Sequence, residues 1–62
     1  MNTPDKIISR MIAKAQQGME FIDALESLIA EMQAEGAAMG WSKETQANIK
    51  IAVPAVLLGM YA

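Results

Sequence analysis

The residues best suited to chemistry are the acidic side chains of the central segment. Five carboxylates stand there without a cation, mostly at the spacing of neighbours on a helix: Glu20, Asp23, Glu26, Glu31 and Glu35. Such pairs can share a metal ion or a proton. The rest of a catalytic site is missing, because the chain has no histidine and no cysteine, which removes the usual general base, nucleophiles and transition-metal ligands. We therefore expect a protein that is not an enzyme and that holds no metal ion and no cofactor.

A second candidate site lies in residues 36–51. The run from Gly36 to Ile49, GAAMGWSKETQANI, resembles the turn and recognition helix of helix-turn-helix repressors. The resemblance implies DNA binding, with contacts from Lys43, Gln46, Asn48 and Lys50. The chain departs from the motif at two apolar positions, which Glu35 and Gln46 occupy, and the preceding acidic segment would repel phosphates. A DNA-binding transcriptional regulator is thus one alternative function, and an acidic mimic of nucleic acid is another.

The main candidate for a functional surface is the C-terminal segment, residues 51–62. It contains no charged residue, and its apolar side chains fall on all sides of a helix, which then needs cover all round. Its twelve residues rise only about 18 Å, well short of the roughly 30 Å hydrocarbon core of a bilayer, so we expect no membrane span. We predict that this segment and the single tryptophan bind a partner protein. The predicted binding residues are Trp41, Val53, Val56, Leu57, Leu58, Met60 and Tyr61.

The size of the chain favours self-association. A domain of 62 residues hides only about 60 % of the surface that its unfolded chain exposes, and one such core supplies about 3–5 kcal/mol. Without cysteine or histidine, neither a disulfide nor a zinc site with those ligands can add stability. We therefore expect a homodimer, in which the C-terminal segments meet or exchange around a twofold axis.

These features favour a binding protein without catalytic activity. We expect a regulator or inhibitor that binds a larger protein through an apolar helical interface, as the small accessory proteins of phages often do. The first residues include Asp5, Lys6, Ser9 and Arg10, which interrupt the apolar run that a secretion signal requires. We predict a cytoplasmic protein whose partners are a second copy of the chain and a larger protein.

One all-α domain, 1–62, is expected to position these residues, as a helical hairpin followed by an apolar C-terminal helix. The expected helices span about 4–17, 19–39, 43–53 and 54–61. Gly18 suits a left-handed turn and Ser42 suits an N-cap, while Pro54 favours a kink or the start of a fourth helix. A single helix through Gly18 is the alternative, because the apolar residues keep a heptad pattern across it.

Apolar spacing predicts the buried face of each helix. In the first helix the expected stripe is Ile7, Ile8, Met11, Ile12 and Ala15. In the second helix the expected seam is Ile22, Leu25, Ile29 and Met32, widened by Phe21 and Leu28. We expect the solvated polar face of the first helix to consist of Lys6, Arg10 and Lys14. An antiparallel hairpin of the first two helices would bring this face near the acidic second helix. Trp41, beside a turn, is expected to cover the core or to anchor a partner.

Overall fold

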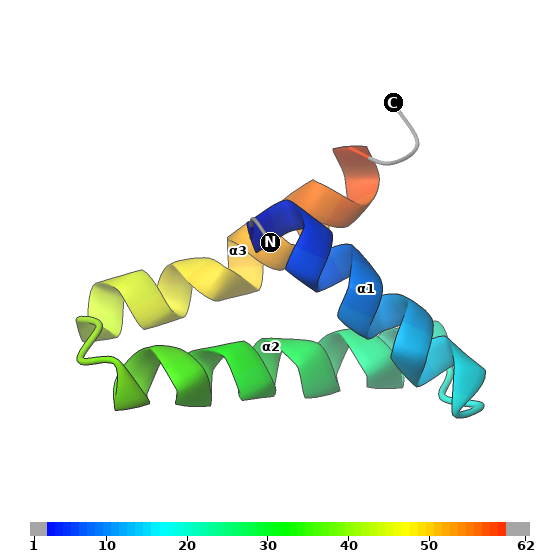
Figure 1. The fold of residues 1–62 in the computed structure, drawn as a ribbon. Coiled ribbons are helices and arrows are strands. Elements are labelled where there is room, and N and C mark those ends of the chain that lie inside the picture. The colour runs from blue at the N-terminus through cyan, green and yellow to red at the C-terminus, as the bar shows by residue number, and fades with distance from the viewer. Residues whose placement is uncertain (1–2, 60–62) are drawn as a thin grey trace.

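The computed structural model describes residues 3–59 and folds them into three helices (Figure 1). These are α1 (Thr3–Gln16), α2 (Phe21–Ala38) and α3 (Lys43–Gly59). No strand occurs within residues 3–59, so the prediction of an all-α fold is confirmed. The prediction of a separate helix over 54–61 is wrong, because Pro54 lies inside α3 and the helix continues to Gly59.

The turn between α1 and α2 depends on Gly18, whose φ is +87°. This left-handed conformation strains an L side chain but not glycine. It allows the Gly18 amide to donate to the Ala15 carbonyl at 3.0 Å, and the Met19 amide to donate to the Lys14 carbonyl at 3.2 Å. These two bonds form the Schellman arrangement that closes a helix. The predicted break at Gly18 is therefore confirmed, and a single helix through both segments is ruled out.

The turn between α2 and α3 uses the same arrangement at Gly40, whose φ is +83°. The Gly40 amide donates to the Ala37 carbonyl at 3.1 Å, and the Trp41 amide donates to the Gly36 carbonyl at 2.9 Å. The Trp41 indole then lies directly against Gly36, where a Cβ would overlap the ring. Gly36 is therefore the residue that lets Trp41 pack onto the end of α2.

α3 begins with the N-cap that the sequence predicts. The Ser42 hydroxyl accepts a hydrogen bond from the Thr45 amide at 3.1 Å, which satisfies a free amide of the first turn. The Gln46 side chain donates to the Trp41 carbonyl at 2.9 Å. The Gln33 side chain of α2 donates to the Gln46 carbonyl at 3.2 Å. Together these bonds fix the start of α3 against α2.

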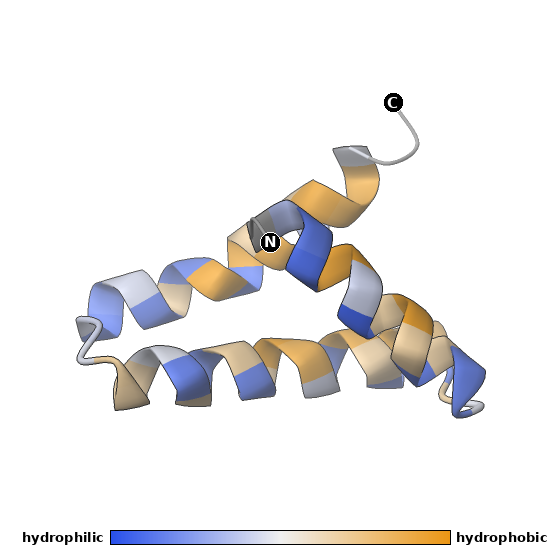
Figure 2. Ribbon diagram, viewed as in Figure 1, coloured by the Kyte–Doolittle hydropathy of each residue, from blue (hydrophilic) through white to orange (hydrophobic). Residues whose placement is uncertain are grey.

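α2 and α3 form an antiparallel hairpin, and α1 packs against both arms (Figure 1). Residues of the two arms that lie beside each other are found in pairs at increasing distance from the turn. These pairs are Gly36 with Trp41, Gln33 with Gln46, and Leu25 with Pro54. Hydrophobic residues occur along all three helices and dominate the second half of α3 (Figure 2). The side chains buried between the helices lie about four residues apart: Ile7, Met11, Ala24, Leu28, Met32, Ile49, Val53 and Leu57.

The predicted buried face of α2 is correct for Met32 and Leu28 and wrong for the other predicted residues. Leu25 and Ile29 are only partly buried, and Ile22 is 65 % exposed. The buried row instead runs through Ala24, Leu28, Met32 and Gly36. Because an α-helix has 3.6 residues per turn, a row of every fourth residue winds round the axis. It faces α1 near the start of α2 and Trp41 near the end.

Pro54 bends α3 without ending it. Proline has no amide hydrogen, so it leaves the Lys50 carbonyl without a helical hydrogen bond. The second half of α3, orange in Figure 1, turns away from the line of the first half. Leu57 is buried beyond this bend and holds the last turns against α1 and the start of α2.

We predict that Gly36→Ala destabilises the protein, although alanine favours a helix over glycine by about 1 kcal/mol. The new Cβ must displace the Trp41 indole, and overpacking of this kind typically costs about 1–3 kcal/mol, so a net loss is expected. Urea unfolding followed by circular dichroism measures the free energy of unfolding. The fluorescence of Trp41, the single tryptophan, should shift to longer wavelength.

The matched control is Gly59→Ala, because nothing lies within 4 Å of the position that its Cβ would take. That substitution should leave the free energy of unfolding within about 1 kcal/mol of the wild type. If Gly36→Ala were as stable as the wild type, with unchanged fluorescence, the packing of Trp41 on Gly36 would be contradicted.

Candidate functional site

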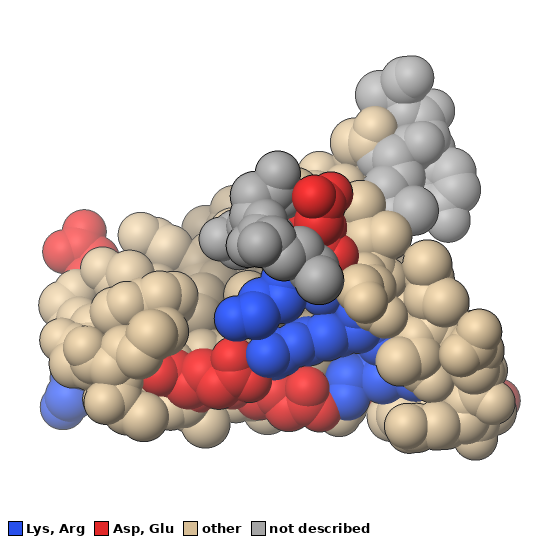
Figure 3. All heavy atoms as spheres, viewed as in Figure 1, with Lys and Arg blue, Asp and Glu red and all other residues tan. Residues whose placement is uncertain are grey.

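Charged side chains link α1 to α2 in a ladder of ion pairs (Figure 3). The Arg10 guanidinium donates two hydrogen bonds to the Glu35 carboxylate, at 2.6 and 2.9 Å. The Lys6 ammonium lies 3.9 Å from the same carboxylate. In Figure 3 the blue cations of α1 lie against red carboxylates of α2. The prediction that the basic face of the first helix lies near the acidic helix is confirmed, but the antiparallel hairpin is formed by α2 and α3 and not by the first two helices, as predicted.

Lys14 corrects the expectation that this basic face is solvated. Only 9 % of the residue is exposed. Its ammonium donates to the Glu31 carboxylate and, at 3.0 Å, to the Ser27 hydroxyl. Lys14 follows Met11 by three residues and so shares the face of α1 that packs on α2. A buried charge without partners is costly, and the two acceptors on α2 remove that cost.

The ladder also shifts the pKa values of Glu35 and Arg10. The hydrogen bonds from Arg10 lower the pKa of Glu35 most, partly opposed by desolvation, and the charges of Arg10 and Lys6 lower it further. The same hydrogen bonds raise the pKa of Arg10. Two of the five carboxylates of the central segment are thus engaged within the fold. Within residues 3–59, acidic side chains form no group of three that could hold a metal ion.

The candidate nucleic-acid contacts are only partly brought together, because Lys43, Gln46 and Lys50 recur at helical spacing along one side of α3 and Asn48 does not. Lys43, Asn48 and Lys50 are exposed, but Gln46 is partly buried with its amide bound to the Trp41 carbonyl. Asn48 lies on the same side of α3 as Trp41, whereas Lys50 lies beside α2. The antiparallel hairpin of α2 and α3 also differs from a helix-turn-helix motif, whose helices cross at about 90–120°.

The predicted protein-binding residues divide between the core and the surface. Val53 and Leu57 are buried and hold the three helices together. Val56 packs partly buried against that core, whereas Leu58 is 71 % exposed. Trp41 lies on Gly36, as described above. The last two of the predicted residues lie outside the described range: Met60 and Tyr61.

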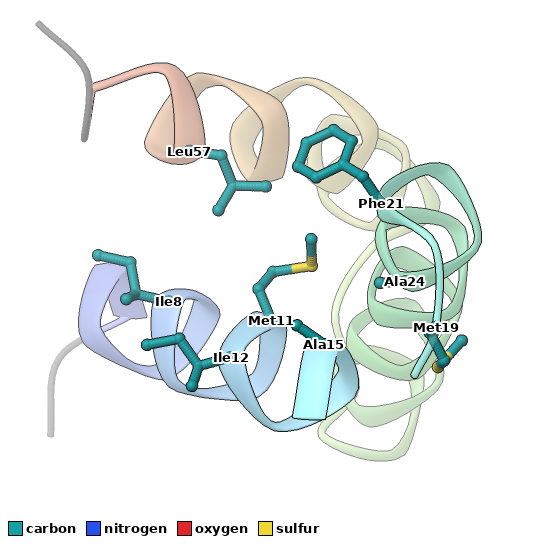
Figure 4. A pocket seen from close by; sticks show the side chains of 8 residues that line it. All are labelled: Ile8, Met11, Ile12, Ala15, Met19, Phe21, Ala24 and Leu57. Atoms are coloured by element: carbon teal, nitrogen blue, oxygen red, sulfur yellow. The ribbon is translucent and has the colours of Figure 1, made fainter. Parts of the chain in front are cut away.

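A depression of about 240 Å³ opens between α1, the start of α2 and the end of α3 (Figure 4). Figure 4 shows Phe21 and Leu57 facing Met11 across the opening, with Ile8 and Ile12 along α1. The complete lining is Ile8, Met11, Ile12, Ala15, Met19, Phe21, Ala24 and Leu57. Every one of these side chains is apolar.

A second depression of about 180 Å³ adjoins the first and shares Phe21 and Leu57 with it. Its lining is Phe21, Leu25, Pro54, Leu57 and Leu58. We call the two depressions together the apolar groove. As far as the structure describes the chain, no charged residue lines the groove, while Ile12 and Phe21 are 51 % and 60 % exposed.

Several groove residues were predicted to lie in the core, and this prediction is wrong for Ile12, Ala15 and Phe21, which are exposed. In α1 the buried row keeps Ile7 and Met11 but leaves Ile12 on the flank toward the groove. The width of the apolar face, which Ile8 and Ile12 extend well beyond one row, indicates that part of it stays at the surface, but it does not indicate which part. A helix that buries one row must leave the remainder at the surface.

Comparison with known proteins gives no match: no protein-family model, no curated protein and no solved structure matches the chain. Across residues 3–59, none of the helices has the length and apolar character needed to cross a membrane.

We predict that Glu35→Gln lowers the free energy of unfolding at neutral pH and has less effect in acid. The pKa of Glu35 is lower in the folded chain than the value of about 4.3 expected when the chain is unfolded. The ion pair therefore contributes fully above the unfolded pKa, and this contribution is lost as the pH falls through the folded pKa. Urea unfolding at a series of pH values should show wild type and variant converging below about pH 4.

Glu26→Gln is the control, because Glu26 lies on the exposed side of α2. Its unfolding profile should stay close to that of the wild type throughout. A constant difference between wild type and Glu35→Gln from neutral to acid pH would show that the ladder does not produce the effect.

Proposed function

We propose that this chain is a non-enzymatic protein-binding module, a small regulator or inhibitor that acts through an apolar helical interface. The observation that carries the proposal is the apolar groove, to which all three helices contribute and whose lining is entirely apolar. The centres of protein interfaces are depleted in charged residues and enriched in aromatic residues and methionine. The groove has this composition, with Phe21 at its centre and Met11 and Met19 in its lining.

The dimensions of the groove suit the side chains of a helix better than a separate small molecule. Sites for drug-sized ligands have volumes of about 300–1,000 Å³, whereas the two depressions measure about 240 and 180 Å³. Phe21 and Leu57 lie between them, so each depression can take one large side chain. Amphipathic helices present apolar anchors three or four residues apart, and two such anchors can enter the two adjoining depressions. We therefore propose that the ligand is the apolar face of a helix in another protein.

A binding role without catalysis is supported by the chemistry of the lining. General acid–base and nucleophilic catalysis require titratable or nucleophilic side chains at the site. In the part of the chain that the structure describes, the groove lining offers none of these. The cations Arg10 and Lys14, which are nearest in sequence, instead pair with carboxylates of α2.

Two protein partners belong to the proposal, a second copy of the chain and a larger protein whose activity the chain regulates. Exposed apolar residues beside a groove mark an interaction site on a small protein, and Ile12, Phe21 and Leu58 are such residues. A cytoplasmic location is also part of the proposal and fits the absence of cysteine from the sequence.

Site-specific photocrosslinking in cells of the source organism tests the proposed function. A photoreactive phenylalanine analogue replaces Ile12 or Leu58 at the groove or, as a matched control, Ala30 on the exposed side of α2. Because the proposed partner covers the groove, we expect adducts heavier than two chains from positions 12 and 58 and none from position 30. Equal yields from all three positions would refute the proposal, and so would the absence of such adducts from the groove.

A further inference from the structure

We propose that a second copy of this chain occupies the apolar groove when no target is bound, in a twofold dimer in which Phe21 of each protomer enters the larger depression of the other. The inference rests on the proposed function, because it names one occupant of the same groove. It also moves the dimer interface from the C-terminal segment alone to a surface built by all three helices.

The groove is self-complementary, as a twofold interface requires. In such an interface the same patch serves both subunits, so each patch must carry both a projecting group and a recess. Phe21 is the projecting group, since it is 60 % exposed and stands where the two depressions meet. The recess lies beside it, with Ile12, Ala15 and Met19 in its lining.

The distribution of charge allows this face to meet its own copy. Contact between identical faces places like charges opposite one another, which is costly. Among the described residues that line the groove there is no charge to repel, although the whole chain carries a formal net charge of −2. The cations of α1 pair with α2 on the other flank of the helix. The uncharged lining therefore places no like charges opposite one another when two copies meet.

The size of the chain also favours a second copy. A standard interface takes about 800 Å² from each partner, which is less than a fifth of the 4338 Å² accessible surface of the chain. The groove and its exposed neighbours Ile22 and Leu58 offer apolar area for this contact. A domain this small gains more from covering such area than a large domain does, because its own core is limited.

Because both occupants use one groove, self-association and target binding exclude each other. The dimer is then the storage form of the regulator, and a target must compete with the second copy for Phe21 and the recess beside it. By mass action, a higher concentration of the chain holds a larger share of grooves closed.

Sedimentation equilibrium of the full chain over a wide concentration range tests the dimer. We expect wild type to reach the mass of two chains. Phe21→Glu and Ile12→Glu should each weaken the dimer by about 100-fold or more, as substitutions at an interface hot spot do. Ala30→Glu, on the exposed side of α2, should leave the dimer unchanged. Circular dichroism checks that each variant remains helical.

A mixture of two charged variants separates an interface effect from a folding defect. Phe21→Lys and Ile12→Glu should each be monomeric alone, because each homodimer would bury a charge without an opposite charge at the contact between positions 21 and 12. In the mixed dimer, the introduced ammonium and carboxylate face each other at one contact, and the wild-type Phe21–Ile12 contact forms at the other. We therefore expect a heterodimer from the mixture, which misfolded chains would not give.

Two results would overturn the inference: a wild-type chain that stays monomeric at the highest concentration, or a dimer that both glutamate variants leave intact. Either result would remove the second copy from the proposed partners, but neither decides the binding of a larger protein, which depends on adducts heavier than two chains at Ile12 and Leu58. Conversely, a dimer that behaves as expected while such adducts are absent supports the inference and refutes the role in binding a larger protein.

Discussion

The constraint on which this structure depends is that each helix buries little more than one row of side chains. α1, α2 and α3 have 14, 18 and 17 residues, and three helices of this length cannot surround one another. The buried apolar cluster of the described residues accordingly takes side chains about four apart on each helix. The sequence supplies apolar residues for wider faces than this. The remainder must lie at the surface, and where it gathers it forms the apolar groove.

With so small a core, the ends of the helices carry more of the stability than they do in a large domain. Both turns close with the same pair of hydrogen bonds around a left-handed glycine, Gly18 or Gly40, and Ser42 caps the helix that follows the second turn. An N-cap alone contributes about 1 kcal/mol, a sizeable fraction of what a core of this size supplies. Gly36 extends the core beyond the helix end, since its missing side chain admits Trp41.

The features that the sequence predicts correctly are local ones. A left-handed glycine and a serine cap act within a few residues, so Gly18 and Ser42 identify the ends of the helices without any knowledge of the fold. A contact between residues five apart, such as Gly36 and Trp41, is common in the Schellman turn. This contact could therefore also be predicted from the sequence. The exposure of Ile12 and Phe21 could not be predicted in this way, because a heptad pattern assumes two straight helices that pack along one seam. Which apolar flank is covered depends on how α1 lies across the hairpin, and that is set by contacts distant in sequence.

The ion-pair ladder and the apolar groove are two consequences of one orientation of α1. The cations stand on the flank of α1 that meets α2, and Ile8 and Ile12 stand on the flank toward the groove. If α1 rotated to bury Ile8 and Ile12, Lys14 would leave Glu31 and Ser27, and Arg10 would lose both hydrogen bonds to Glu35. Lys14 is only 9 % exposed, so taking it away from its two acceptors is costly, whereas the partly exposed pair of Arg10 and Glu35 contributes about 0–1 kcal/mol. The ladder therefore opposes the collapse of the groove, and the molecule keeps an apolar surface that its own three helices do not cover.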